Sequence, residues 1–422
     1  MNYDFPNIYH IEDIRFAIQD RDEFVIAKRD WGYVVNYLVA KTDTFPATSE
    51  SKNTHYCPGC NRTSSEIEKE GCGSQRCPDL LNSASVRREC RGLIFDLAGN
   101  IMARRLHKFF NVNEKDETLQ NKLDLSQPHI ILEKLDGSMV TPIQVSNHIR
   151  WGTKMGITDV SMNAEIFVAK HRHYQEFADK EMDLDNTPIF EWCSKKNKIV
   201  VDYPVDRLVL IAIRNNISGQ YIPYNEMVRR ARQYGIDYVK SYPGSASSMQ
   251  SLIDNTRQSE GIEGWIIRFD GGHMVKVKGD WYVRIHKNKE AISQEKNILD
   301  LIVNDKLDDV LPFLLEEDLE AVITFEKDFW EGFDRQVDIY TKYFKMVTAS
   351  GLDRKSYAQN WMPTIKTQDP FAPSIVFGCF DGKDISTMLL EHIRRNISTQ
   401  TKVDSVRYLW NGYDWNHGQV NE

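Results

Sequence analysis

The feature that most constrains the fold is a change in hydrophobic pattern near residue 290. Before it, short runs rich in β-branched and aromatic residues alternate with polar turns, as half-buried strands do. After it, apolar residues recur at three- and four-residue spacing with acidic residues between them, which indicates amphipathic helices. The sequence therefore predicts a mixed, mainly antiparallel α+β domain over residues 1–292 and an all-helical domain over 293–422.

Within the first domain, two strands are predicted in 22–40 around the turn Asp30-Trp31-Gly32, and helices over 159–182 and 224–234. Further strands are predicted at 91–96, 129–135, 139–145, 149–153, 187–192, 207–213, 263–269 and 273–278. In the second domain, a second helical group over 384–411 is expected to follow a proline-containing link at 363–373.

The charge of the chain excludes few partners. The formal net charge of -8 arises within residues 293–422, which hold 14 basic and 22 acidic side chains, so the remainder is neutral. A neutral domain with local Lys and Arg clusters can still bind phosphates. No apolar run approaches the ~18 residues of a membrane span, and the N-terminus lacks the pattern of a signal peptide. A cytoplasmic protein without a membrane partner is therefore expected.

Residues 41–85 interrupt the strand pattern and contain a cysteine cluster. The stretch is polar and is interpreted as an insertion or a small metal-stapled loop. Cys57, Cys60, Cys72 and Cys77 offer four thiolates for a closed tetrahedral zinc site, and His55 could replace one of them. Such a site would be structural, because four thiolates leave no position open for a substrate. The alternative is a surface loop with reduced, unliganded cysteines.

The segment Glu133-Lys134-Leu135-Asp136-Gly137-Ser138 places a lysine at the end of an apolar strand, just before a tight turn. An amine attacks phosphorus or carbonyl carbon only in its unprotonated form, so partial burial or a nearby cation must favour loss of the proton. Taken alone, the segment is equally compatible with an exposed lysine beside a hairpin turn.

A second group of charges follows. Glu263-Gly264 precedes the strand WIIRF, and Lys276 and Lys278 alternate in the next strand, so both ammonium groups lie on one face. Two adjacent cations repel each other unless an anion lies between or before them, and a triphosphate is a suitable anion. The alternative is a solvated lysine face on an edge strand.

Three shorter features lie upstream of this group. Arg91-Gly92 opens one strand, and Lys108-Phe109-Phe110-Asn111 joins a cation to an aromatic pair that could stack on a base or lie in the core. Glu191 ends the apolar strand PIFEW, where a carboxylate is costly unless it meets a metal, a cation or a hydroxyl group. A structural salt bridge would satisfy it equally well.

In this order, R-G, K-F-F-N, E-K-L-D-G-S, F-E-W, E-G and V-K-V-K resemble the motif series of the covalent nucleotidyltransferases. Within that superfamily the series is similar to the phage-type RNA ligase 1 family of ATP-dependent single-strand RNA ligases, over roughly residues 22–290. The resemblance implies a nucleotidyltransferase domain with ATP-grasp-like antiparallel sheets. It also implies a helical C-terminal domain in place of the OB domain of DNA ligases and capping enzymes.

The resemblance also implies residue roles. Lys134 would attack the α-phosphorus of ATP, with Asp136 and Gly137 shaping its turn. Glu191 and Glu263 would bind the ribose or the waters around Mg²⁺ or Mn²⁺, and Lys276 and Lys278 would bind the α-phosphate. The nucleotide-binding positions implied by the resemblance are Tyr37, Arg91, Lys108, Phe110, Lys154, Gly264 and Tyr282.

The implied activity joins RNA 5′-phosphate and 3′-hydroxyl ends through a lysyl-AMP and an RNA-adenylate intermediate. The implied substrate is single-stranded or nicked-loop RNA such as broken tRNA, and the enzyme would act as a monomer in the cytoplasm, or in the host cytoplasm if it is phage-encoded. One alternative is an inactive, zinc-containing RNA-binding protein on the same scaffold. Another is a DNA ligase or capping enzyme, against which the lack of an all-β segment after Lys278 argues.

Overall fold

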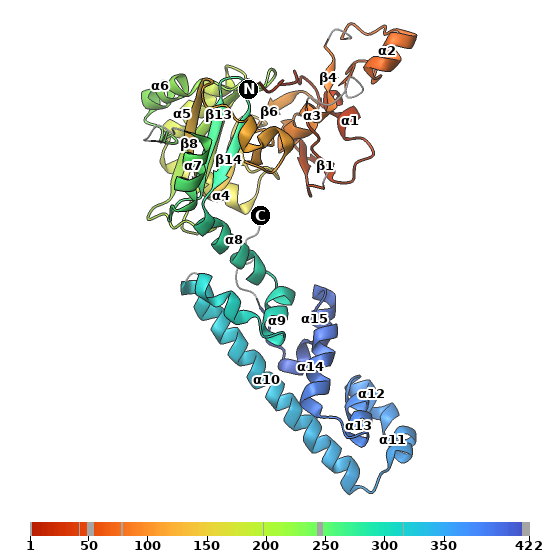
Figure 1. Cartoon of the computed structure of the whole chain (residues 1–422). Coiled ribbons are helices and arrows are strands. Elements are labelled where there is room, and N and C mark those ends of the chain that lie inside the picture. Colours follow the sequence, from red (N-terminus) through yellow and green to blue (C-terminus); the bar gives the residue numbers. More distant parts are fainter. Residues whose placement is uncertain are drawn as a thin grey trace. The chain divides into compact units, whose positions relative to one another are not determined.

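The computed structural model describes residues 2–41, 43–48, 55–76, 79–196, 198–242, 248–314 and 316–415. It divides into two compact units, Met1–Val283 and Arg284–Glu422 (Figure 1). The division falls inside helix α8 (Asp280–Ile292), whereas the sequence pattern placed the change after residue 292.

The first unit is built on three four-stranded sheets (Figure 1). The first sheet has the order β1-β2-β5-β6, with β1 (Phe24–Arg29), β2 (Gly32–Tyr37), β5 (Leu93–Phe95) and β6 (Ile101–Ala103). The second has the order β10-β9-β11-β12, with β10 (His148–Gly152), β9 (Ser138–Val145), β11 (Asn186–Cys193) and β12 (Arg207–Asn215). The third has the order β7-β14-β13-β8, with β7 (Phe110–Asn111), β14 (Met274–Lys278), β13 (Gly264–Phe269) and β8 (His129–Lys134). All neighbouring strands are antiparallel except β7 and β14, which confirms the predicted antiparallel α+β class.

Helices cover the outer faces of these sheets. A core cluster joins the second sheet to α4 (Asp159–Lys170), α5 (His173–Met182) and α6 (Tyr224–Tyr234). Another joins the third sheet to α7 (Met249–Arg257), and α1 (Glu12–Ile18) and α3 (Ser83–Glu89) pack on the first sheet. Between the second and third sheets lie apolar side chains from both, namely Ile189, Ala212, Ile266 and Met274. The two sheets therefore face each other across a shared core.

Two predictions for this unit need correction. The stretch 159–182 is two helices, because His171 leaves the helical conformation and its ring stacks on Phe167, with ring centroids 4.1 Å apart. The segment 41–85 contains more regular structure than a loop: α2 (Ser64–Glu70), α3, and a ladder of β3 (His55–Tyr56) with β4 (Leu81–Asn82). Thr63 and Glu66 form a capping box that starts α2.

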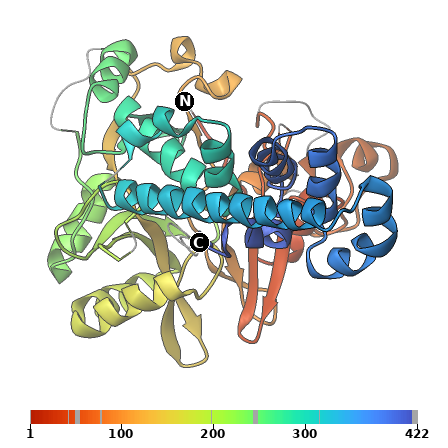
Figure 2. The same cartoon turned by 90° about the horizontal axis from the view of Figure 1, so that it is seen from below.

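All regular elements in the described part of the second unit are helices, as predicted. Its longest element is α10 (Glu316–Ala349), visible in Figures 1 and 2. Around it lie α9 (Glu295–Val303), α11 (Arg354–Asn360), α12 (Met362–Gln368), α13 (Ala372–Phe380), α14 (Ile385–Arg395) and α15 (Gln400–Val406). Short 3-10 turns of this unit occur at Leu307–Asp309, Leu311–Phe313 and Arg407–Trp410, and two more lie in the first unit at Asp116–Thr118 and Gln120–Lys122.

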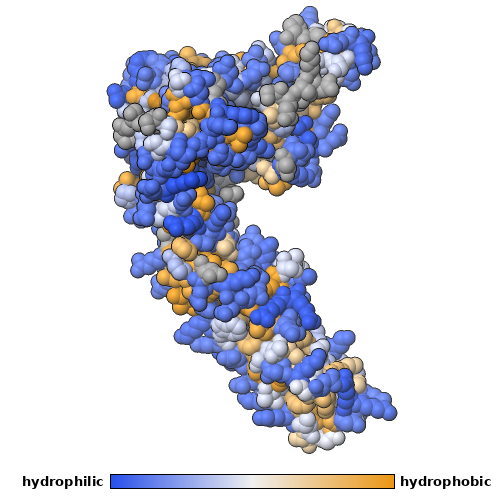
Figure 3. All heavy atoms as spheres, in the orientation of Figure 1, coloured by the Kyte–Doolittle hydropathy of each residue, from blue (hydrophilic) through white to orange (hydrophobic). Residues whose placement is uncertain are grey.

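The link predicted at 363–373 is mostly helix, which corrects the sequence interpretation. Pro363 and Pro373 lie in the first turns of α12 and α13, where a missing backbone N–H costs no helical hydrogen bond. None of the described helices is long and apolar enough to cross a membrane. The face seen in Figure 3 is mainly hydrophilic, with hydrophobic residues interspersed.

Candidate active site

Lys134 ends strand β8 and forms an ion pair with a buried carboxylate. Its ammonium lies 2.6 Å from one oxygen of Glu263, and the ammonium of Lys278 lies 3.0 Å from the other. The Glu263 side chain is only 4% exposed, so both pairs are shielded from water. One carboxylate therefore holds two of the predicted catalytic lysines side by side. The sequence predicted an anion close to Lys278, and in the structure the carboxylate of Glu263 is such an anion.

Gly264 sets the register of this arrangement. Strand β13 lies between β8 and β14, and Gly264 is paired with Lys134 on one side and with Lys278 on the other. Its φ of +149° disfavours a side chain, and a Cβ atom would lie 2.0 Å from the carbonyl oxygen of Val277. Only glycine allows strand β14, which bears Lys278, to approach β13 this closely at the site.

The turn between β8 and β9 is held by hydrogen bonds to Asp136, which is 3% exposed. The Asp136 carboxylate accepts hydrogen bonds from the backbone N–H groups of Val200 and Val201, each at 2.7 Å. It also accepts one from the Tyr282 hydroxyl at 2.7 Å, while the Asp136 N–H donates to the Tyr203 hydroxyl at 2.9 Å. This geometry fits a residue that shapes the turn.

Gly137 allows strand β11 to lie against the same turn. A Cβ atom at Gly137 would lie 2.5 Å from the carbonyl oxygen of Trp192 and 3.2 Å from Cγ of Glu191. The missing side chain thus brings Glu191 close to the lysine-bearing turn.

Glu191 is a carboxyl group in an environment that disfavours its charge. The pKa of Glu191 is raised to about 8, mainly by burial. The nearby carboxylates of Glu263 and Asp136 contribute to this rise, and the cations Lys134 and Arg91 oppose it. A bound cation would relieve this repulsion, so the donor set suits a divalent metal ion.

Lys276 lies on β14, where it pairs with Ile266 of β13. Burial and, to a smaller extent, four neighbouring cations together lower the pKa of the Lys276 ammonium to about 7. These cations are Lys108, Lys134, Arg91 and Lys278. Such a concentration of positive charge is suited to a polyphosphate anion.

Aromatic rings from β2, from the segment after β2 and from β7 surround a further cation. The Lys108 ammonium lies 5.4 Å from the ring centroid of Tyr37, 5.6 Å from that of Phe45 and 5.5 Å from that of Phe110. Phe110 is 3% exposed and belongs to the core of the first sheet. Its contact with the site is therefore made through Lys108.

The pKa of the Tyr37 hydroxyl reflects the cations around it. Burial alone would raise the pKa of the Tyr37 hydroxyl, but the charges of Arg91, Lys108 and Lys154 outweigh burial and lower it. Residues from the first sheet, from the segment before β7 and from the turn after β10 thus share one electrostatic environment.

The structure arranges the predicted site residues in two adjoining groups. The first surrounds the lysine turn and contains Lys134, Asp136, Gly137, Glu191, Glu263, Gly264, Lys278 and Tyr282. The second contains Tyr37, Arg91, Lys108, Phe110 and Lys154. Lys276 links them, since cations of both groups lower its pKa.

Sequence reasoning missed several residues that support these groups. Tyr203, Val200 and Val201 reach Asp136 from 64 or more residues away in the chain, and no local pattern marks such a contact. Phe45 was hidden in the segment interpreted as an insertion.

Three of the four predicted zinc ligands lie together. The sulfur of Cys72 is 3.7 Å from that of Cys57 and 3.3 Å from that of Cys60. Tetrahedral zinc with Zn–S bonds of ~2.3 Å places its sulfurs about 3.8 Å apart, so this spacing fits the ion. Cys77 lies outside the described residues, and within them His55 is not part of the cluster.

The pKa of Lys276 gives a testable pH dependence. Affinity for an ATP analogue with a methylene group between the α- and β-phosphorus should fall in the wild type as pH rises through about 7, because Lys276 loses its charge. Lys276→Arg keeps the charge, so the ratio of wild-type to variant Kd should rise above pH 7. Calorimetric titration of both proteins cancels the ionisation of the nucleotide. A constant ratio from pH 6 to 9 would contradict the prediction.

Comparison with known proteins finds a family model that matches the segment containing most of these residues. A family model described as RNA ligase, of the T4 RNA ligase 1 type, matches residues 89–282. The match includes every predicted site residue except Tyr37 and the cysteine cluster.

Two curated relatives resemble part of the chain. A candidate RNA ligase of Thermovibrio ammonificans is 27% identical over 234 residues, which cover 53% of this chain and 60% of the relative. A candidate bifunctional polynucleotide kinase/RNA ligase of Autographa californica nuclear polyhedrosis virus is 26% identical over 245 residues, or 53% of this chain and 34% of the relative. The chain thus spans about three fifths of the first relative and a third of the second.

Solved structures give lower similarity. An archaeal ATP-dependent RNA ligase has a TM-score of 0.40 at 13% identity, covering 66% of this chain and 64% of the other. A Naegleria gruberi RNA ligase mutant has a TM-score of 0.36 at 15% identity, covering 44% and 58%. The family match to residues 89–282 confirms the resemblance to the phage-type RNA ligase 1 family that the motif order indicated.

Proposed function

We propose that this chain is an ATP-dependent RNA ligase that joins RNA 5′-phosphate and 3′-hydroxyl ends. The observation that carries the proposal is the setting of Lys134. Its amine contacts Glu263 at the end of a strand, beside Lys278 and within the influence of Lys276. The cations beside this lysine are placed to bind the phosphates of a nucleotide that its amine attacks.

In the first step the neutral amine of Lys134 attacks the α-phosphorus of ATP. The bond from this phosphorus to the bridging oxygen breaks, pyrophosphate leaves, and the amine loses its proton to solvent. AMP remains on Lys134 through a P–N bond. Lys276 and Lys278 bind the α-phosphate and offset the charge that develops there, while Asp136 keeps the turn in place.

Glu191 and Glu263 are the residues that would hold Mg²⁺ or Mn²⁺, through water, and the ion would neutralise phosphate charge. Glu263 would pair less strongly with Lys134 if it also held the waters of such an ion, and a weaker pair would favour the neutral amine required for attack. Glu191, with its pKa raised to about 8, gains its charge most readily when a cation is present.

The second and third steps use the same residues. An oxygen of the RNA 5′-phosphate attacks the phosphorus of lysyl-AMP, and the P–N bond breaks with its electron pair going to nitrogen. The nitrogen takes up a proton from solvent, and Lys134 regains its amine. A 3′-hydroxyl group then attacks the adenylated 5′-phosphate, loses its proton, and AMP leaves with the electrons of the broken P–O bond. A phosphodiester bond results.

The proposal is tested by incubating the protein with α-labelled ATP and a divalent metal ion, and then denaturing it. Label should remain on the polypeptide, return to ATP on addition of pyrophosphate, and pass to a 5′-phosphorylated RNA oligonucleotide before that RNA is joined. If the protein takes up no label even after pyrophosphate has removed any bound AMP, the ligase proposal fails. An inactive RNA-binding scaffold would then be the better account.

The finer parts of the proposal rest on the family resemblance. We propose single-stranded or nicked-loop RNA such as broken tRNA as the substrate, a monomer as the active form, and the cytoplasm, or a phage-infected host's cytoplasm, as the location. Joining rates for tRNA cleaved in its anticodon loop should exceed those for an unstructured oligonucleotide of equal length. Equal rates would remove the support for repair of tRNA.

We also propose that Cys57, Cys60 and Cys72 bind a structural zinc ion, for which Cys77 is the fourth candidate ligand. The protein purified without chelator should contain about one zinc ion per chain, as four-thiolate sites do. Cys57→Ser and Cys72→Ser should each lower the zinc content, while Cys379→Ser in the helical unit should leave it unchanged. Elemental analysis of the four proteins measures this, and a wild type free of zinc would contradict the proposal.

A further inference from the structure

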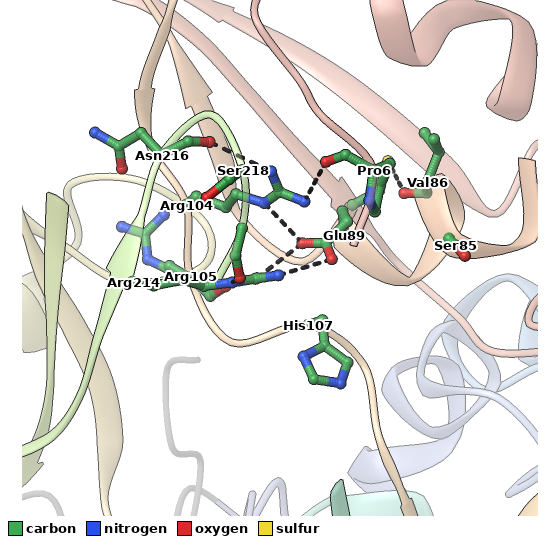
Figure 4. Close-up of polar contacts among 12 residues, drawn as sticks. Pro6, Ser85, Val86, Glu89, Arg104, Arg105, His107, Arg214, Asn216 and Ser218 are labelled. Carbon is green, nitrogen blue, oxygen red and sulfur yellow. Dashed lines mark hydrogen bonds and ion pairs between the residues drawn. The ribbon is translucent and has the colours of Figure 1, made fainter. Parts of the chain in front are cut away.

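Arg105 is a buried cation with no ion pair to a carboxylate among the described residues. It is 2% exposed, and its guanidinium donates hydrogen bonds to the carbonyl oxygens of Gly92 and Gly152, the latter at 2.9 Å. Its Nε has no hydrogen-bond partner in the described part of the chain. The adjacent Arg104 differs, since it contacts the carboxylate of Glu89 (Figure 4). Burying a guanidinium without a carboxylate partner costs free energy. The contacts that Arg105 does make therefore indicate why it is buried.

The two carbonyl groups that Arg105 joins belong to different sheets. Gly92 follows Arg91 and precedes β5 of the first sheet, whereas Gly152 ends β10 of the second sheet, two residues before Lys154. Arg105 thus connects the first and second sheets at the segments that carry Arg91 and Lys154.

The two segments are in direct contact beside this link. Gly92 has a φ of +80°, and a Cβ atom there would lie 2.8 Å from Cα of Lys154 and 3.1 Å from Nη1 of Arg105. On the other side of Lys154, the Asn36 side-chain amide donates to the sulfur of Met155 at 3.0 Å. The backbone of the Lys154 turn is therefore held against the first sheet by the contact with Gly92 and by the Asn36–Met155 hydrogen bond. Arg105 adds hydrogen bonds from a charged group to both sides.

We propose that Arg105 is a positioning residue that fixes the spacing of Arg91 and Lys154, the two cations expected to bind phosphates of ATP. This inference rests on the proposed function. Cations that come from separate sheets can bind one triphosphate only if the sheets keep a fixed separation. A small displacement of either cation would weaken binding of the triphosphate. The planar guanidinium suits the task, because it can donate to two carbonyl groups at once, whereas an ammonium has a single centre.

The test compares Arg105→Met and Arg105→Lys with the wild type in two reactions. In self-adenylylation, Arg105→Met should raise the KM for ATP roughly tenfold to a hundredfold, because the phosphate contacts are misplaced, with a smaller change in kcat. Joining of RNA that already carries 5′-AMP should be unchanged, because that step binds no triphosphate. The KM of Arg105→Lys for ATP should lie between those of the wild type and Arg105→Met. Arg150→Met is the control, because Arg150 lies on strand β10, which ends at Gly152, and forms a partly exposed pair with Glu165; it should match the wild type.

A purely structural role would give a different result. If Arg105→Met and Arg105→Lys lower ATP-dependent and adenylated-RNA joining in parallel, or leave the KM for ATP unchanged in folded protein, the positioning role is overturned.

The titration of Tyr37 tests the same claim without turnover. Its hydroxyl pKa lies below the usual value because Arg91, Lys108 and Lys154 are close. In Arg105→Met or Arg105→Lys this pKa should rise, as seen by NMR of ring-labelled tyrosine assigned with Tyr37→Phe. An unchanged titration in both variants overturns the inference. A wild type that takes no label from ATP refutes the ligase proposal instead, and the Tyr37 titration still decides whether Arg105 positions the cations.

Discussion

Replacing Lys134 with arginine is expected to abolish transfer of AMP from ATP to the protein, by at least roughly a thousandfold. A guanidinium stays protonated under all working conditions and has no free electron pair for attack on phosphorus. It can still form an ion pair with Glu263, which now lies 2.6 Å from the lysine ammonium. The change therefore removes the nucleophile while it retains the charge that the buried carboxylate requires.

The measurement is the amount of label that remains on the denatured polypeptide after incubation with α-labelled ATP. The same variant should still join RNA that already carries 5′-AMP, within about tenfold of the wild type, because that step needs the cations and not the amine. Lys240→Ala is the matched control, since Lys240 is an exposed lysine whose carbonyl oxygen accepts from Glu133 N–H. If Lys134→Arg is labelled as well as the wild type, another residue is the nucleophile.

The lysine strands could be predicted from the sequence because their pattern is local. Alternation within β14 places Lys276 and Lys278 on one face, and the tight turn after Lys134 follows from Asp136-Gly137. The strand carrying Glu191 is mostly apolar, which is typical of a buried strand. Lys134 and Lys278 end such strands, so the sequence alone marks them as candidate site residues.

The parts that escaped prediction depend on contacts distant in sequence or on ambiguous local signals. The helical turns that begin with Pro363 and Pro373 look like a link, because proline is common both in links and in first helical turns. Arg105 and Glu89 are ordinary charged residues on paper, and only the fold shows that both are buried. No spacing rule connects Arg105 to Gly152, since their contact depends on how two sheets meet.

The contact between the sheets also depends on a second buried cluster, centred on Glu89 at the end of α3 (Figure 4). The Glu89 carboxylate lies 3.0 Å from Nε of Arg104 and 2.8 Å from Nη2 of Arg214, and all three side chains are almost completely buried. Arg104 also donates to the carbonyl oxygens of Pro6 and Ile217, at 2.9 Å and 2.7 Å. The cluster therefore joins α3, the N-terminal segment and strand β12.

Glu89→Ala is expected to lower the free energy of unfolding of this unit by about 3–5 kcal/mol, because it leaves two buried guanidinium groups without their shared carboxylate. Glu89→Gln keeps one acceptor and should cost less. As a control, Glu165→Gln removes a half-exposed partner of Arg150 and should cost under about 1 kcal/mol. Denaturant titration followed by tryptophan fluorescence compares the four proteins. Equal losses for Glu89→Ala and Glu165→Gln would contradict the prediction.

The same cluster predicts how stability depends on pH. Burial opposes ionisation of Glu89, but Arg104 and Arg214 overcome it and lower the pKa of Glu89 to about 2. An unfolded glutamate has a pKa near ~4.3, so between these values the unfolded chain binds the proton and the folded protein does not. The stabilisation is complete above the unfolded pKa and is lost as pH falls towards about 2. Wild-type stability should therefore decrease more steeply between pH 5 and 3 than that of Glu89→Gln, whose side chain does not titrate. Parallel pH curves for the two proteins would mean that the ion pairs around Glu89 do not hold the sheets together.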